Sequence, residues 1–549
     1  MRGTKEMTDK KELSAWIFSG IFGFLTGVFL VFGYQLEKLD HIDLSDRNAM
    51  LIMLMIMVVV TFDTRHVFRG YDLAVNEGKK LFGLVHIDNK LVEKEAGRRD
   101  YLINYLVMNI LCLPVLISEF PGFFVYDARE ELDEVLTRTF TTHHPLFHVL
   151  LLGTVIALIH KLTGSWNLGI VTYLILQMLV INGIFAYAVT YMQRRGIGRK
   201  QRILWVIFYG AFPTIVMYTL CSCKDGLFSA LLLLITVLLT ELCRDTEGFL
   251  KDRGKTALFV IASALMPLFR HNGFYAYLVF VPFALVHFRK KLKSILPAML
   301  ILPVVLYLVI SNLLTLALKP SGTHHQEMLT VPIMQLARVY SYEGDTIDPS
   351  DNEIIESYIP KEDLMKYTPR LSDLVKVNFN NALYEQNKKD FFGVWYRLFL
   401  QHPLSYLNAW LLTSYGYCYP PAAFNTYKGN TVYTFTYEDS SYFGYETEPP
   451  GERTVLIPPI DTLYRYLSLG PFYKDAPVLY LLFAPGLLVL IYMFVFAYRL
   501  SKKRIHQILP FLPMILTFST VLLGPTYLIR YVLYLWLCLP LIFITGGKE

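Results

Sequence analysis

Long apolar runs recur along nearly the whole chain and limit what it can fold into. They approach the ~20 residues that an α-helix needs to cross a bilayer. Only 17% of the 549 residues are charged, whereas a soluble domain carries about 25%. The sequence therefore predicts an all-α polytopic membrane protein with about twelve transmembrane helices, at 14–36, 48–67, 101–118, 168–191, 203–220, 227–243, 256–269, 274–288, 294–317, 477–498, 507–523 and 526–545.

One further apolar segment, 146–162, is short and is interrupted by His148, His160 and Lys161. Short cytoplasmic loops of membrane proteins collect lysine and arginine. If this segment does not cross, the basic loops share the inner face with the amino terminus; these loops are 194–202, 244–255, 289–293 and 499–504. We therefore expect a juxtamembrane helix at 146–162 and not a span.

This topology divides the chain into four parts. Residues 1–100 hold two transmembrane helices and a cytoplasmic connection, and 101–317 form a transmembrane core with an outer loop at 119–148. Residues 318–475 form one mixed extracytoplasmic domain, and 476–549 add three further spans. Within the outer domain we expect helices at 331–342, 351–358 and 391–412, and a loop-like stretch from Tyr415 to Pro471.

The outer loop concentrates ionisable groups beside the membrane, where such groups indicate a functional site. Asp127 follows an aromatic run, so we place it just above the bilayer, where a carboxylate can take a proton or hold a metal ion. Glu130 is a second candidate. For Glu131, Asp133 and Glu134 we favour the solvated face of a short helix. His143 and His144 could bind a metal or phosphate, or could belong to a helix start capped by Thr142.

Three cations lie at other outer turns. Lys224 precedes Asp225, Arg270 precedes His271 and Asn272, and Arg530 is the only charge in the last span. Cations at a bilayer surface can neutralise a phosphate leaving group, although a lysine there can also merely extend to the interface. No phosphate-binding glycine loop is present, and the six scattered cysteines form no metal or disulfide framework.

The order of these motifs resembles the GT-C superfamily of membrane glycosyltransferases. The matching stretches are Pro121-Gly122 with Asp127-Ala128-Arg129-Glu130, His143-His144-Pro145-Leu146, Lys224-Asp225-Gly226-Leu227-Phe228, Arg270-His271-Asn272-Gly273 and Arg530-Tyr531. The last three look more like a largely uncharacterised bacterial branch of that clan. The resemblance implies a GT-C-like fold and transfer of a sugar from a polyprenyl-phosphate donor to a surface glycan on the outer face of the cell membrane.

The resemblance also assigns roles. Asp127 would be the base of an inverting transfer, with Glu130 beside it. Lys224, Arg270 and Arg530 would bind the donor phosphate, and the substrate would contact His143, His144, Asp225, His271 and Asn272. A Mg²⁺ or Mn²⁺ ion could bind Asp127, Glu130 and His144, although the Asp-x-x-Glu spacing departs from the paired acidic motif common in the superfamily.

The resemblance implies several partners, namely the lipid-linked donor, the glycan acceptor, membrane lipids, a donor-synthesising enzyme and a flippase. It implies no nucleic acid. Two alternatives remain open. One is a polymerase or ligase that joins lipid-linked glycans. The other is a lipid or saccharide transporter, which would use charges along a path through the bilayer and pseudo-repeated halves.

Overall fold

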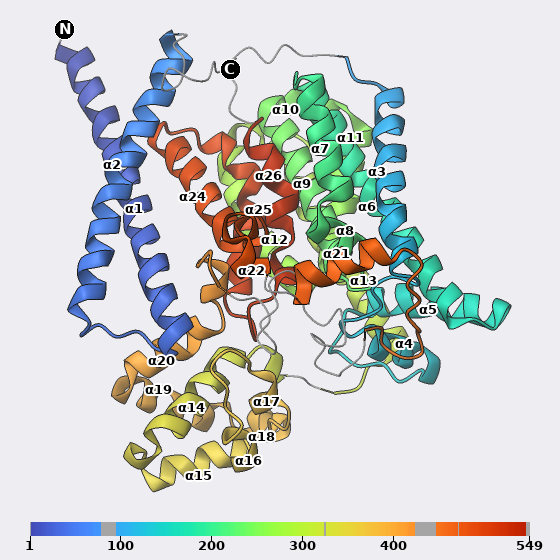
Figure 1. Ribbon diagram of the computed structural model, residues 1–549, viewed down its shortest axis with the longest axis vertical. Coiled ribbons are helices and arrows are strands. Elements are labelled where there is room, and N and C mark those ends of the chain that lie inside the picture. The colour runs from blue at the N-terminus through green and yellow to red at the C-terminus, as the bar shows by residue number, and fades with distance from the viewer. Residues whose placement is uncertain (1, 78–94, 323–324, 423–445, 470–471, 545–549) are drawn as a thin grey trace.

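The computed structural model describes residues 2–77, 95–322, 325–422, 446–469 and 472–544. In these residues every regular element is a helix, and strand pairing is limited to isolated bridges. Figure 1 shows the two chain ends at one end of a helix bundle and the helices α14 to α20 at the other. The prediction of an all-α membrane protein is confirmed. Residues 78–94 of the expected cytoplasmic connection lie outside the described residues.

In the part of the chain that the structure describes, seven helices are long and apolar enough to cross a membrane. They are α1 (Arg2–Leu39), α2 (Arg47–Glu77), α3 (Arg98–Ser118), α5 (Leu146–Thr163), α6 (Trp166–Arg194), α9 (Asp225–Arg244) and α13 (Leu296–Leu318). Two bent pairs raise the number to nine if each pair is one span. They are α7 (Arg199–Ala211) with α8 (Pro213–Thr219), and α23 (Pro477–Tyr480) with α24 (Pro485–Ser501). Each bend coincides with a proline at the first position of the second helix, where it has no N–H to donate.

The remaining predicted spans are shorter or broken. Residues 256–269 and 274–288 fall in α11 (Arg253–Phe269) and α12 (His271–His287), next to α10 (Thr246–Lys251). The stretch 507–523 divides into short 3-10 turns and α25 (Leu512–Val521). The stretch 526–545 is not one helix, because it contains the 3-10 turn η8 (Ile529–Val532) followed by α26 (Tyr534–Ile542). Pro510, Pro513 and Pro525 interrupt the helical hydrogen bonding there.

One contact at the start of α5 bears on whether this helix crosses the membrane. The Nζ atom of Lys224, a residue just before α9, lies 3.1 Å from Nδ1 of His144, a residue just before α5. Between these two residues the chain forms α5, α6 and the α7–α8 pair. If α6 and the α7–α8 pair each cross once, His144 and Lys224 share a face only when α5 does not cross. Helix α5 also slants away from the bundle in Figure 1, at the level of α4 (Ala128–Thr137).

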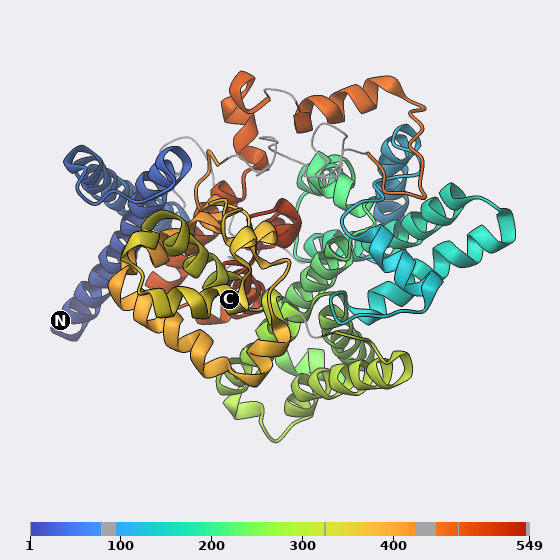
Figure 2. The same cartoon turned by 90° about the horizontal axis from the view of Figure 1, so that it is seen from below.

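The segment 318–475, expected to be a mixed extracytoplasmic domain, has only helices as regular elements where the structure describes it. It contains α14 (Thr330–Glu343), α15 (Pro349–Tyr358), α16 (Lys361–Leu364), α17 (Asp373–Lys376), α18 (Asn381–Gln386), α19 (Lys388–Gln401) and α20 (Pro403–Leu412). These helices share a core of their own that includes Ile333, Ile355 and Phe391. The single helix expected over 391–412 breaks at His402, because Pro403 begins a new one. Figure 2, the view from below, shows this domain in front of the bundle, on the side of α1 and α2 and apart from α4 and α5.

The expectation of a loop from Tyr415 to Pro471 was wrong in part. Pro458 begins the helix α21 (Pro458–Leu469), and α22 (Phe472–Asp475) follows. Proline is favoured at the first helical position, so a proline pair there starts a helix and does not mark a loop. Tyr464 and Leu467 of α21 are buried. Residues 423–445 of this stretch lie outside the described residues.

Candidate functional site

The loop between α3 and α4 is held from two sides. On one side, Phe123 N–H donates to the carbonyl of Leu220 (3.0 Å), and Ser222 N–H donates to the carbonyl of Phe123 (3.0 Å). On the other side runs the segment 446–454, which we call the strap. Thr454 N–H donates to the Phe120 carbonyl (2.8 Å), and Glu448 N–H donates to that of Phe124 (2.8 Å). The loop that carries Asp127 is therefore fixed to both neighbours.

Asp127 occupies the N-cap position of α4 but does not cap it. Its backbone is left-handed, with φ of 74°, a conformation that aspartate and asparagine tolerate better than most residues. An N-cap aspartate ordinarily accepts a hydrogen bond from the first turn, yet this side chain makes none. Glu448 takes over that role, because its Oε2 accepts from Arg129 N–H (2.8 Å). The Asp127 carboxylate is free to face other groups.

Two cations flank the Asp127 carboxylate. Its Oδ2 lies 3.5 Å from Lys224 Nζ and 3.4 Å from Arg530 Nη1, and 32% of the side chain stays exposed. Burial opposes ionisation, but the charges of Arg530 and Lys224 outweigh it and hold the Asp127 pKa well below its usual range. Asp127 is therefore ionised at neutral pH and accessible on one side.

Lys224 links Asp127 to a second carboxylate and to a histidine. Its Nζ lies 3.3 Å from Glu131 Oε1 and donates to His144 Nδ1 (3.1 Å). Because an ammonium group only donates, the proton of neutral His144 is on Nε2, which donates to Glu130 Oε2 (3.2 Å). That hydrogen bond is the main reason that the Glu130 pKa is lowered.

Glu131 was expected on a solvated face, and this interpretation was wrong. Only 1% of its side chain is exposed, and Glu134 is buried as well, whereas 53% of the Asp133 side chain is exposed. Ala128, Glu131 and Leu132 lie on the inward face of α4 by helical spacing. Burial disfavours the charged form of Glu131, but His148 and Lys224 outweigh it and lower its pKa to about 2.

A chain of buried polar groups continues inward from Glu131. Its Oε2 contacts His148 Nδ1, and His148 Nε2 lies 2.8 Å from the Tyr173 hydroxyl. The Gln177 amide donates to the carbonyls of Thr219 and Cys221, so its oxygen accepts from Tyr173 (3.0 Å). Tyr173 then accepts from His148 Nε2, so the His148 ring is held between Tyr173 and Glu131.

The other two predicted cations join the same cluster. Arg270 is paired with Asp225, and its guanidinium lies over the Tyr531 ring, 4.5 Å from the centroid. Arg530 lies against the same ring, at 4.9 Å, and against Tyr126 at 4.6 Å. Among the described residues, Asp225 Oδ2 and Arg530 Nε find no hydrogen-bond partner. Lys224, Arg270 and Arg530 are thus each paired with a carboxylate, and the two arginines share the Tyr531 ring.

Two predicted residues lie at the edge of this cluster and do not contact Asp127. His271 Nδ1 lies 3.4 Å from the Tyr307 hydroxyl, and Asn272 donates to Thr520 Oγ1 (3.0 Å). His143 packs edge-on against the ring of His144, with 4.4 Å between centroids.

Among the described residues, one group could hold a metal ion: Glu130, His143 and His144, whose ligand atoms lie within 4.8 Å of one another. Asp127, which the sequence suggested as a ligand, does not belong to this group. Mg²⁺ and Mn²⁺ prefer oxygen ligands, and this set offers one carboxylate. A metal on His144 Nε2 would also require a proton on Nδ1, where Lys224 already donates. The arrangement in this structure does not fit the expected cation.

Sequence reasoning missed Glu131, His148 and Glu448. The first two could have been found by helical spacing, because each shares a face with apolar residues: Glu131 with Ala128 and Leu132, and His148 with Val149 and Leu152. Glu448 gave no local signal, since its contact with Arg129 joins residues 319 positions apart.

The fold and site define a helical membrane protein with a polar cluster at one end of its bundle. A family of unknown function, DUF6020, matches residues 134–549, and the chain belongs to this family. The match begins within α4, after Asp127, Glu130 and Glu131. No curated protein and no solved structure matches the chain.

Proposed function

We propose that the protein is a GT-C-type glycosyltransferase of the bacterial cell membrane. It transfers a sugar from a polyprenyl-phosphate donor to a hydroxyl of a surface glycan on the extracytoplasmic face. A GT-C-like core, with about twelve spans when the short and bent helices are counted, belongs to this proposal. The observation that carries it is the Asp127 carboxylate, which is partly exposed and does not cap α4 although it occupies the N-cap position. Two cations suited to a phosphate flank it.

In the proposed reaction the acceptor oxygen attacks the anomeric carbon of the donor. The bond between that carbon and the phosphate oxygen breaks, and its electron pair leaves with the polyprenyl phosphate. The proton of the attacking hydroxyl passes to Asp127, which becomes a carboxylic acid. In-line attack inverts the configuration at the anomeric carbon.

The cations explain how a carboxylate with a low pKa serves as the base. A phosphate that approaches Lys224 and Arg530 competes with Asp127 for their charges and adds negative charge beside it. Both effects raise the Asp127 pKa when the donor binds. The phosphate gains a further negative charge as it leaves, so the same cations favour the transition state over the bound donor. Each step uses Asp127, Lys224 and Arg530, and none requires a metal.

The alternatives are distinguished by the position of the charges. A transporter would need ionisable groups along a path through the bilayer, whereas Asp127, Lys224, Arg270 and Arg530 gather at one end of the bundle. A polymerase or ligase of lipid-linked glycans would use the same cluster and differs in its product.

The test compares surface glycans of cells that make the wild type, Asp127→Asn or Asp133→Asn at equal membrane levels. Asparagine also tolerates the left-handed backbone at position 127, so the variant should fold. Loss of a general base costs about 10²–10⁴-fold in rate, and we expect one sugar to disappear from the glycan. Asp133→Asn lies on the exposed face of the same helix and should change nothing.

Three results would contradict this proposal in different ways. A change of polymer length with unchanged sugar composition would favour the polymerase or ligase. Unchanged glycans in Asp127→Asn cells would remove Asp127 from the reaction. Loss of the sugar in both variants would indicate a folding defect of α4 and not a catalytic role for Asp127.

A further inference from the structure

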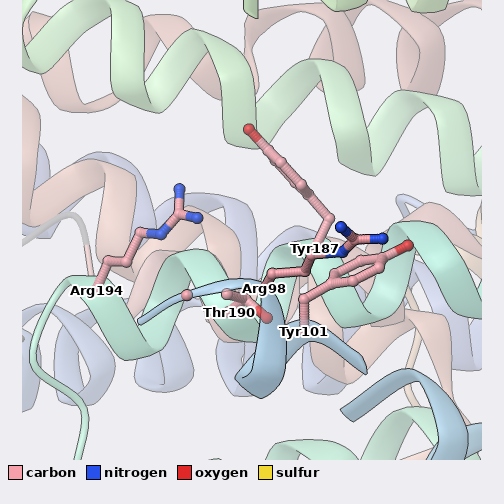
Figure 3. Close-up of a pocket in the computed structure, with 6 residues that line it drawn as sticks. Arg98, Tyr101, Tyr187, Thr190 and Arg194 are labelled. Carbon is pink, nitrogen blue, oxygen red and sulfur yellow. The ribbon is translucent and has the colours of Figure 1, made fainter. Parts of the chain in front are cut away.

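A second polar feature lies at the opposite end of the bundle from Asp127. A hollow of about 330 Å³ opens between the start of α3 and the end of α6. Its lining consists of Gly97, Arg98, Tyr101, Tyr187, Thr190 and Arg194. Figure 3 shows the side chains of Arg98 and Tyr101 from α3 and of Tyr187 and Arg194 from α6 around it. The proposed transfer reaction does not use any of these residues.

The two arginines are exposed but are not paired with carboxylates of the described chain. Arg194 Nε donates to the Ala96 carbonyl (3.0 Å), which orients the guanidinium and leaves its two Nη groups available. The nearest acid along the chain, Asp100, is already bonded to Gln193 (2.9 Å) and Arg202 (3.5 Å). Figure 3 shows the two guanidinium groups on different sides of the hollow, and each can present several donors in a fixed plane to an anion held there.

The rest of the lining suits a group that reaches the site from the membrane. Tyr101 and Tyr187 are partly exposed aromatic side chains at the ends of long apolar helices, as is usual at a membrane surface. Thr190 is buried, and its hydroxyl accepts from Asn104 and donates to the Ala186 carbonyl, so it lines the hollow with its hydroxyl already bonded. Gly97 leaves space, since an added Cβ would meet no atom within 4 Å.

We infer that this hollow binds a phosphate group, carried by an anionic phospholipid of the leaflet on this side of the membrane. Arg98 and Arg194 contact the phosphate oxygens, and the two tyrosines lie beside the glycerol and the first carbons of the acyl chains. The basic loops that follow α6 and precede α3 mark this end as the inner face. Basic pockets between helices on that face are suited to anionic headgroups.

The experiment uses the full-length protein in detergent and measures retained lipid by native mass spectrometry. The probes are phosphatidylglycerol, phosphatidylcholine and inorganic phosphate. The test variant is R98Q/R194Q, and the matched control is R289Q/K290Q, which removes two exposed positive charges from a basic loop assigned to the same face. We expect phosphatidylglycerol to bind the wild type and the control about tenfold or more tightly than R98Q/R194Q, since each charge-assisted contact contributes about that factor.

Phosphatidylcholine should bind all three proteins weakly and equally, and millimolar inorganic phosphate should not displace phosphatidylglycerol. Equal binding of phosphatidylglycerol to all three proteins would overturn the inference. Displacement by inorganic phosphate, with the same dependence on Arg98 and Arg194, would assign the hollow to free phosphate and overturn the lipid as its source. Both variants replace exposed side chains, and unchanged melting temperatures would verify that they fold.

Discussion

At the scale of single residues, the cluster is distinguished by side chains that do not serve their ordinary structural role. Asp127 stands at an N-cap without capping, and the distant Glu448 supplies the missing acceptor. The residue types at the outer turns could be read from the sequence, because the short turns assigned to that face hold few charges. The pairing of these charges could not be read from the sequence, since Asp127 pairs with Lys224 and with Arg530, which lie in distant parts of the chain.

The buried pair of Glu131 and His148 gives a prediction about stability. Glu131→Gln removes the buried carboxylate that pairs with Lys224 and contacts His148, which should lower the unfolding free energy by about 3–5 kcal/mol. Denaturant titration of the purified protein in detergent measures this loss. Asp133→Asn, on the exposed face of α4, should stay within about 0.5 kcal/mol of the wild type.

A double-mutant cycle separates the pair from its surroundings. In Glu131→Gln/His148→Gln both partners are replaced, so the double variant should lose less than the sum of the two single losses. Additive losses would show that the two side chains do not interact.

At the scale of elements, hydrophobic patterning predicted most helices but not the way in which they are interrupted. The apolar runs 507–523 and 526–545 read as spans, yet prolines divide them into short pieces, and Arg530 lies in one of these. Helix α21 was missed because Pro458-Pro459 was read as a loop signal. The strap could not be predicted, since its bonds to Phe120 and Phe124 are made by backbone groups and carry no side-chain pattern.

The strap should respond to pH through Glu448. Burial, with the nearby charges of Asp127 and Glu130, raises the Glu448 pKa to about 7 from a usual value of about 4.3. The folded strap therefore holds a proton that the released strap loses. Its stability is greatest below the usual pKa, falls as pH rises towards 7, and changes no further above that.

Hydrogen exchange of residues 446–454, corrected for the intrinsic pH dependence, tests this behaviour. Protection should fall by up to about tenfold per pH unit between pH 5 and 7 and level off above. Glu448→Gln stays neutral and should reduce the slope of the profile between pH 5 and 7. A wild-type profile that is already flat between pH 5 and 7 would contradict the assignment.

At the scale of the whole molecule, lysine and arginine placement predicted that four distant turns would share one end of the bundle. The contacts of Asp127, Lys224, Asp225, Arg270 and Arg530 confirm that they meet. That this end of the bundle faces the outside of the cell stays a prediction. The position of the outer domain could not be derived, because it depends on long-range bonds such as that of Arg370 to Asp40.

Labelling of introduced cysteines by a membrane-impermeant reagent in intact cells tests the topology. With α5 on the outer surface, Asp133→Cys and Lys389→Cys should react and Lys290→Cys should not, except after the cells are opened. Reaction of Lys290→Cys in intact cells, or protection of Asp133→Cys, would contradict this arrangement.

The most direct test of sugar transfer is the pool of lipid-linked sugars in cells that make the wild type or Asp127→Asn. Mass spectrometry of extracted lipids would identify a polyprenyl-phosphate sugar by its mass. The proposed function predicts that one such donor accumulates in the Asp127→Asn cells and stays low with the wild type or Asp133→Asn. An identical set of lipid-linked sugars in all three would contradict the claim that Asp127 and its two cations consume a polyprenyl-phosphate donor.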